Sequence, residues 1–363
     1  MRWEGVDKNV AKMVSETKLD QARERRKVRE AFKDVQLRID HCLFKGNHTG
    51  LRTKENSFYL RFLFEMDTNV VSYIQSYEVN SRGLEIFSKS WLPENSSIQA
   101  LVCFCHGYGD TCTFFFEGVA MRLASSGYGV FAMDLPGFGL SEGLHGYIPN
   151  FDYLVDDVIE HFSKIKENPE YNGLPSFMFG GSMGAAIALK VHFKQPDSWD
   201  GAILVAPMCK ISDEIMPPWP VKQFLVAMAK LLPEKKIVPL KDLGELAFRD
   251  RTKLEQASYN VLRYRGKARL RTALEIIRTT REIEQRLEEV CLPLLILQGE
   301  FDSVTDPSGS KALHEKASCT DKKLCLYEDS YHALLEGEPD EMIIQILNDI
   351  FSWLDDHVKR LRR

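Results

Sequence analysis

Apolar and polar positions follow two different periodic patterns along this chain. Six short apolar runs are typical of buried strands, and between them apolar residues recur every three or four positions, as in amphipathic helices. The strand-like runs are residues 100–107, 129–137, 176–181, 201–207, 293–302 and 322–329. The helical pattern is clearest at residues 153–167, 183–194 and 339–360. This alternation predicts an α/β fold, with a mostly parallel sheet covered by helices on both faces.

Two segments before the first apolar run have patterns of their own. Residues 76–93 alternate around an Asn-Ser-Arg-Gly turn, which predicts a β-hairpin at one edge of the sheet. Residues 16–40 are highly charged and carry one apolar stripe at helical spacing, formed by Val28, Phe32, Val35 and Ile39. Such a stripe predicts an amphipathic helix packed on the main domain, with docking on a partner as the alternative.

The alternation of strands and helices breaks at residues 208–290, which contain no clear strand. We interpret this segment as a helical cap inserted after the fourth core strand. The predicted organisation is therefore an N-terminal extension over residues 1–75 and a core formed by residues 76–207 and 291–363, with the cap at 208–290 between its two parts.

Composition narrows the class of protein. The chain has 363 residues and a formal net charge of −5, and its basic residues are accompanied by acidic ones, which argues against a nucleic-acid-binding surface. Its eight cysteines show no zinc-like spacing, so we expect reduced thiols in an intracellular protein. The first fifteen residues fit neither a signal peptide nor a transit peptide, and no apolar run reaches the length of a membrane span. These features predict a cytoplasmic protein and leave its oligomeric state open.

The stretch Gly180-Gly181-Ser182-Met183-Gly184 lies between a predicted strand and a predicted helix. A serine nucleophile on such a strained turn needs small neighbours, because the residues on either side of it approach each other closely. The bare spacing also occurs in glycine-rich loops, but the strand before it and the helix after it favour a nucleophile at Ser182.

Two side chains after later strands complete a catalytic set in the chain order Ser, Asp, His. Asp302 comes first after the fifth strand and is favoured over Asp306, which is expected to cap the helix that begins at Pro307. His332 follows the sixth strand, so it is expected at the same edge of the sheet as Ser182. We assign structural roles to the other candidate histidines, His161, His192 and His314.

The loop HGYGD, residues 106–110, follows the first core strand. In this position an α/β-hydrolase supplies one of its two oxyanion N–H groups, so the backbones of Tyr108 and Met183 are the predicted donors. Further candidates for substrate binding are His106, Gly107, Met216 and Trp219, although for His106 a structural role in shaping the loop is favoured. This chemistry predicts hydrolysis of a small-molecule ester through an acyl-enzyme, and it requires no metal or organic cofactor.

Five stretches together resemble the plant monoacylglycerol lipase-like proteins, a group that includes caffeoylshikimate esterase and lysophospholipase-like proteins. They are HGYGDTCTFFF, DLPGFGLSEGLHGYI, GGSMGAAIALK, APMCKISDEIMPP and YHALLEGEPDE, and the similarity runs from about residue 77 to the C-terminus. The resemblance implies an α/β-hydrolase with a helical cap that hydrolyses monoacylglycerols, lysophospholipids or phenolic esters. It also implies that Ser182, Asp302 and His332 form the triad. An acyltransferase and a ligand-binding receptor on the same fold are the alternatives.

The resemblance also leads to expectations for three parts of the chain. Lipases of this family commonly have His or Glu where Gly181 stands, so rate or substrate choice is expected to differ here. Residues 56–76 look like an extra segment, for which an artefact of the gene model is favoured over an additional edge strand. Residues 222–233, KQFLVAMAKLLP, have an apolar face that suits both an acyl pocket and packing against the core, with membrane contact as a further alternative.

Overall fold

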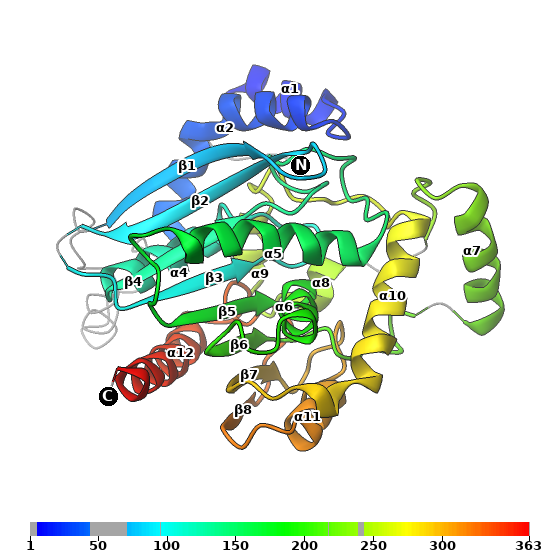
Figure 1. Ribbon diagram of the computed structural model, residues 1–363. Coiled ribbons are helices and arrows are strands. Elements are labelled where there is room, and N and C mark those ends of the chain that lie inside the picture. Colours follow the sequence, from blue (N-terminus) through cyan, green and yellow to red (C-terminus); the bar gives the residue numbers. More distant parts are fainter. Residues whose placement is uncertain (1–5, 44–70, 95, 217, 239–242, 363) are drawn as a thin grey trace.

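The computed structural model describes residues 6–43, 71–94, 96–216, 218–238 and 243–362, without the side chains of residues 34–43. A sheet of eight strands forms the centre of the molecule, with the spatial order β1-β2-β4-β3-β5-β6-β7-β8 (Figure 1). The strands are β1 Val71–Val79, β2 Glu85–Pro93, β3 Ala100–Cys105, β4 Tyr128–Met133, β5 Ser176–Gly181, β6 Gly201–Val205, β7 Leu294–Gly299 and β8 Lys322–Tyr327. Strands β1 and β2 are antiparallel to their neighbours, and the pairings from β4 to β8 are all parallel. The predicted α/β fold with an antiparallel hairpin at one edge is therefore confirmed.

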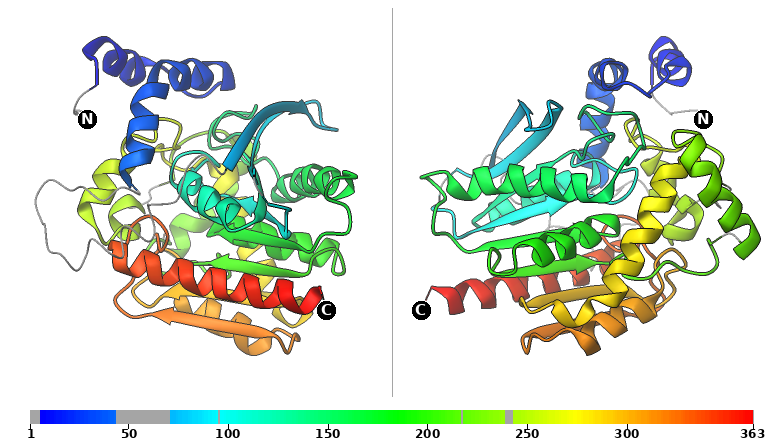
Figure 2. Two further views of the ribbon diagram at one scale, coloured as in Figure 1. Left: turned by 90° about the vertical axis from the view of Figure 1, so that its left-hand side faces the viewer. Right: turned by 45° about the vertical axis from the view of Figure 1, so that its right-hand side comes forward.

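Helices cover both faces of this sheet (Figure 2). One face packs on α5 Phe151–Glu167, α6 Met183–Lys194 and α11 Pro307–Lys316. The other packs on α4 Phe115–Ser125, α12 Asp340–Leu361 and the N-terminal helix α2 Ala22–Leu43. The inner strands β3, β4, β6 and β7 are buried along their whole length, because both of their faces lie against helices.

The described part of the segment between β6 and β7 consists of helices joined by turns and loops, and its β pairing is one isolated bridge between Ile211 and Thr305. Its helices are α7 Trp219–Leu231, α8 Leu243–Ala247, α9 Arg251–Ala257, α10 Leu270–Gln285 and the short 3₁₀ helix η2 Leu287–Glu289. Helices α7 and α10 lie side by side at one end of the molecule, with α7 farther from the sheet (Figure 1). We refer to residues 208–290 as the inserted segment.

The N-terminal segment, α1 Lys8–Glu16 and α2, is joined to two distant parts of the chain. Val28 and Phe32 of the predicted apolar stripe are buried against the core, whereas the side chains of Val35 and Ile39 lie outside the described residues. The Arg25 guanidinium is fully buried and donates to the carbonyl oxygens of Gly139 at 2.6 Å and Ser141 at 2.5 Å, both in the connection from β4 to α5.

Asp20 extends the same attachment to the inserted segment. Its carboxylate accepts hydrogen bonds from Arg269 at 2.7 Å and from Lys236 at 2.8 Å. The N-terminal segment, the β4–α5 connection and the inserted segment therefore meet at one junction.

Part of the extra segment at residues 56–76 belongs to the sheet. Residues 71–76 belong to β1 and pair with β2 in continuous register, from Val71 opposite Pro93 to Ser76 opposite Ser88. The last six residues of the segment therefore belong to an edge strand, the alternative that the sequence analysis did not favour, and they extend the predicted hairpin. Residues 56–70 lie outside the described residues.

Candidate active site

Ser182 occupies the turn between β5 and α6. It has φ 52° and ψ −114°, a left-handed conformation that is strained for a residue with a side chain. The turn is tight, because a Cβ at Gly180 would lie 2.4 Å from the Gly184 carbonyl oxygen and a Cβ at Gly184 would lie 1.9 Å from that of Cys105. These two glycines let the strand and the helix approach each other, which exposes the serine hydroxyl at the carboxyl end of the sheet.

His332 and Asp302 lie beside this serine. The Nε2 atom of His332 is 3.0 Å from Ser182 Oγ, and its Nδ1 atom is 2.7 Å from Asp302 Oδ2. The three residues are separated by up to 150 positions in sequence and come from the ends of β5, β7 and β8, which meet at the same edge of the sheet. Asp306 is not part of the group; it caps α11 by accepting a hydrogen bond from the backbone N–H of Ser308 at 2.8 Å, as predicted.

The surroundings of Asp302 keep this carboxyl ionised. Burial alone would raise its pKa, but His332 and the hydroxyl and backbone N–H of Thr305 outweigh burial and hold the pKa below its usual range. A carboxylate is only an acceptor, so Nδ1 of His332 must carry the proton and donate it to Asp302. Nε2 is then an acceptor, free to receive the hydrogen bond from the Ser182 hydroxyl.

Two supports of Asp302 were not identified from the sequence. The Thr305 hydroxyl donates to Asp302 Oδ2 at 2.7 Å, and the buried Gln298 amide donates to the same oxygen at 3.0 Å. Ser310 fixes that amide by donating to its carbonyl oxygen at 2.7 Å. The sequence did contain a signal for the glutamine, because Gln298 is a single polar residue in the otherwise apolar strand β7 and a buried polar side chain requires a hydrogen-bond partner.

The loop after β3 lies next to the nucleophile. A Cβ at Gly107 would be 3.5 Å from Ser182 Cβ, so the backbone that leads to Tyr108 passes close to the serine. His106 is fully buried, and its Nε2 accepts a hydrogen bond from the backbone N–H of Leu135 at 3.0 Å while Nδ1 contacts the Gly107 carbonyl at 2.8 Å. These bonds join two loops, so His106 has the structural role favoured above.

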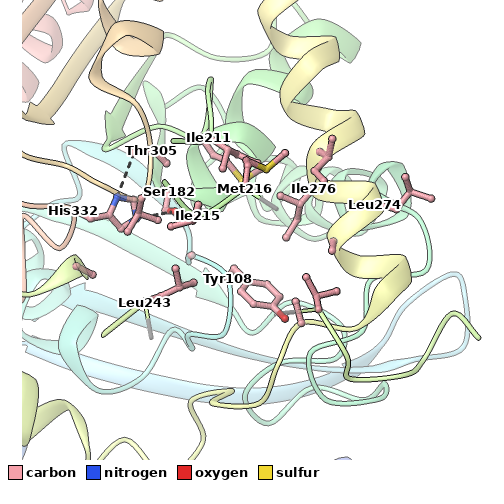
Figure 3. A pocket seen from close by; sticks show the side chains of 18 of the residues that line it. Tyr108, Ser182, Ile211, Ile215, Met216, Leu243, Leu274, Ile276, Thr305 and His332 are labelled. Carbon is pink, nitrogen blue, oxygen red and sulfur yellow. Dashed lines mark hydrogen bonds between the residues drawn. The ribbon is translucent and has the colours of Figure 1, made fainter. Parts of the chain in front are cut away.

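A cavity of about 210 Å³ opens from Ser182 and His332 toward the inserted segment. Figure 3 shows the serine and the histidine at one end of it and Leu274 and Ile276 of α10 at the other. Most of its lining is aliphatic and comes from the inserted segment, including Ile211, Ile215, Met216, Leu225, Val226, Val238, Leu243, Leu270, Leu274 and Ile276. The cavity therefore offers an apolar compartment directly beside the nucleophile.

The predicted substrate-binding residues differ in their positions. Gly107 and Met216 line the cavity. Trp219 does not; it is 72% exposed at the start of α7, and we correct its placement accordingly. Asp110 and Glu336, which were not predicted from the sequence, also line the cavity that Ser182 and His332 line.

Seven cysteines of the described ranges are free thiols. No group of three or more His, Cys, Asp or Glu side chains in the described part of the chain is placed to hold a metal ion. Among the helices that the structure describes, none combines the length and the apolar character needed to cross a membrane.

Comparison with known proteins places the chain in a family. The model of the Hydrolase_4 family, described as serine aminopeptidase, S33, matches residues 96–340, which span β3 to the start of α12. The chain belongs to this family. Ser182, Asp302 and His332 all lie within the matched range of residues.

Relatives and solved structures agree with that membership. The chain is 35% identical to caffeoylshikimate esterase of Arabidopsis thaliana over 76% of its own length and 83% of the relative's. It is 30% identical to monoglyceride lipase of Mus musculus, over 77% and 90% of the two chains. A solved structure of a soluble variant of the monoglyceride lipase of Saccharomyces cerevisiae, in complex with a substrate analog, has the same fold, with a TM-score of 0.71. The two sequences are 21% identical, and the match covers 81% of this chain and 98% of that one.

Proposed function

We propose that this chain is a carboxylic ester hydrolase that cleaves monoacylglycerols or related lipid esters through a Ser182–His332–Asp302 triad. The observation that carries the proposal is the chain of contacts from Ser182 Oγ to His332 Nε2 at 3.0 Å and from His332 Nδ1 to Asp302 at 2.7 Å, at the end of an apolar cavity. Relatives named esterase and lipase support ester hydrolysis as the reaction class.

The first step transfers the hydroxyl proton of Ser182 to Nε2 of His332 while Oγ attacks the ester carbonyl. Asp302 keeps the imidazole in the required tautomer and stabilises the imidazolium that forms. His332 then protonates the leaving alcohol, which departs as the acyl-enzyme forms. A water molecule, activated by the same histidine, hydrolyses the acyl-enzyme and restores the serine.

The oxyanion of each tetrahedral intermediate would be held by the backbone N–H groups of Tyr108 and Met183. Met183 is the first residue of α6, and the first N–H groups of a helix have no partner within the helix. The positive end of the helix dipole adds to the stabilisation of negative charge at this point.

The cavity supports a lipid acyl group as the substrate. An aliphatic lining provides little discrimination by hydrogen bonds, but it stabilises an acyl chain at about 0.8 kcal/mol for each buried methylene group. The inserted segment supplies most of this lining, so we assign it the role of a cap that carries acyl specificity.

A phenolic ester of the caffeoylshikimate type is the second candidate substrate. It is favoured by the 35% identity with the Arabidopsis thaliana caffeoylshikimate esterase and by the carboxyl groups of Asp110 and Glu336, which can bind hydroxyl groups near the scissile bond. Both candidates use the same triad, and they differ in which ester the cavity prefers.

The test compares hydrolysis of a 2-monoacylglycerol and of caffeoylshikimate by the wild-type protein and by Ser182→Ala. We expect turnover of the glyceride and a loss of at least about 10³-fold in kcat for the variant, because the nucleophile is removed. Preference for the phenolic ester would select the second candidate. Retention of activity in the variant would contradict the mechanism, and acyl transfer to an added alcohol in place of hydrolysis would indicate an acyltransferase.

A further feature suits a lipid substrate. Helix α7 leaves apolar side chains exposed, with Trp219 72% exposed at its start and Phe224 61% and Leu231 76% exposed, seven positions apart, along the face away from the cavity. Leu225 and Val226 of the same helix line the cavity. A helix that is apolar on both faces can contact a membrane surface with one face while the other lines the acyl compartment, so peripheral membrane contact through α7 is part of the proposal.

A further inference from the structure

A second cavity, of about 110 Å³, adjoins the first at the catalytic residues. The two share Gly107, Asp110, Ser182, His332, Ala333 and Glu336, and then extend in different directions. The larger one runs toward α7 and α10, whereas the smaller one runs toward α4 and the ends of β3 and β5. A substrate whose scissile bond lies at Ser182 can therefore place one part in each cavity.

Gly181 opens the smaller cavity. A Cβ built at this position meets no atom within 4 Å, in contrast to its neighbours Gly180 and Gly184, where a Cβ would collide with backbone. Gly181 is also absent from the positive-φ glycines of the described chain, so its backbone does not require glycine. The consequence of glycine at this position is space beside the nucleophile, which a side chain would occupy.

The lining of the smaller cavity combines aromatic rings with two carboxyl groups. Phe104 and Phe116 stack on each other, and Phe104 meets Phe179 edge to face, which forms a rigid apolar floor. Asp110 and Glu336 stand where the two cavities meet, next to Ser182 and His332. A compact group with an apolar ring face and hydroxyl groups at its rim matches this lining.

The charges around the two carboxyl groups favour hydroxyl binding. Burial raises the pKa of both Asp110 and Glu336, and the charge of Asp110 raises the pKa of Glu336 further, while Arg263 opposes both shifts and His106 opposes that of Asp110. Because the pair retains a proton more readily than exposed carboxyls do, it presents both a donor and acceptors. Asn260 donates to Asp110 at 3.2 Å and fixes its orientation.

We propose that Gly181 is a specificity-determining residue that admits the alcohol part of the ester, in the form of a ring-sized polyol, into the smaller cavity. The acyl part then occupies the larger cavity, which has about twice the volume and an aliphatic lining. This inference rests on the proposed ester hydrolysis and extends its alcohol side beyond the glycerol of a monoacylglycerol.

The experiment uses three esters with one common acyl chain, of methanol, glycerol and a cyclohexanetriol. For the wild-type chain, Gly181→Ala and Gly181→Leu, we measure kcat/KM on each ester. Gly181→Leu should lower the ratio of kcat/KM for the cyclic ester to that for the methyl ester at least about tenfold, because small changes in pocket volume discriminate by about 10–200-fold. Gly181→Ala should shift the same ratio in the same direction by a smaller factor.

Ala273→Leu is the matched control, since it adds the same side chain to the α10 wall of the larger cavity. It should change the preferred acyl length and leave the alcohol ratio at its wild-type value. If kcat/KM of Gly181→Leu falls by the same factor on all three esters, so that the ratio stays at its wild-type value, the inference is overturned while ester hydrolysis remains in place. A folded wild-type chain that hydrolyses none of the three esters would instead contradict the proposed function, and the inference would fall with it.

Discussion

At the scale of single residues, the candidate site depends on how firmly Asp302 is held. Its oxygens accept hydrogen bonds from the backbone N–H groups of Val304 at 2.8 Å and Thr305 at 2.9 Å, in addition to those from Thr305, Gln298 and His332 side chains. The donors from Val304, Thr305 and Gln298 position the carboxylate, which in turn orients His332.

Replacing Thr305 by valine tests this support. Thr305→Val removes one hydrogen bond to an ionised group, which is worth about 1.5–3 kcal/mol, so we expect kcat to fall by about 10–100-fold with little change in KM. Steady-state kinetics on the preferred ester gives the two constants. Thr305→Ser keeps the hydroxyl and should retain most of the activity; an equal loss in both variants would mean that the threonine methyl group matters, and not its hydrogen bond.

The residues that could be predicted from the sequence are those fixed by local chain geometry. Ser182 was identifiable because a strand, a glycine-flanked serine and a helix follow one another directly. Asp110 and Glu336 were missed because their importance arises from proximity across the fold, between the loop after β3 and the loop after β8. Gly181 was recognised as a departure from the family pattern, but whether its missing side chain left a space or was filled by a neighbour depended on packing.

At the scale of elements, periodicity predicted the core strands to within a few residues but did not identify α4. Seven of the eleven residues of Phe115–Ser125 are buried, including both of its phenylalanines. A helix buried on most sides has no polar stripe, so its sequence lacks the period that marks an amphipathic helix. Helix α7 has the opposite property, since apolar residues on its outer face remain exposed.

That outer face predicts membrane binding by α7. We expect the triple variant Trp219→Ser, Phe224→Ser and Leu231→Ser to bind vesicles of phosphatidylcholine and monoacylglycerol at least about tenfold more weakly than the wild type, because apolar side chains drive interfacial binding. Co-sedimentation measures the affinity.

The hairpin offers a matched control for this experiment. Tyr73, Ile74 and Val79 of β1 are 61%, 58% and 64% exposed, and their replacement by serine removes exposed apolar side chains in another part of the chain. Equal loss of binding in the two sets of variants would show that α7 has no special role in membrane contact.

At the scale of the whole molecule, the junction around Asp20 also contains His145. This histidine is 3% exposed; its backbone N–H donates to the Asp20 carbonyl at 3.0 Å, and its ring packs edge to face on Tyr264. Burial and the nearby charge of Arg25 lower the pKa of His145 to about 3. The ring is therefore neutral in the folded protein and titrates at about 6.5 once the chain unfolds.

This difference predicts acid sensitivity. Below about pH 6.5 the unfolded chain binds a proton at His145 that the folded protein does not bind, so the free energy of unfolding falls with pH by up to about 1.4 kcal/mol per unit down to about pH 3. Well above pH 6.5 the contribution is complete. Between pH 8 and pH 5, urea unfolding should show a loss in wild type that exceeds the loss in His145→Phe by about 2 kcal/mol. Equal losses in the two proteins would exclude His145 as the origin, since all other groups titrate in both.

The ion pair between Asp20 and Arg269 has a consequence for how the protein is made. The two residues are 249 positions apart, and the acceptors of Arg25 in the β4–α5 connection are more than a hundred positions downstream. At the pace of translation, about 5–20 residues per second, Asp20 is synthesised about 12–50 s before Arg269. During this interval the N-terminal helices have no inserted segment to bind. The N-terminal helices thus leave the ribosome well before the inserted segment that completes their final contacts.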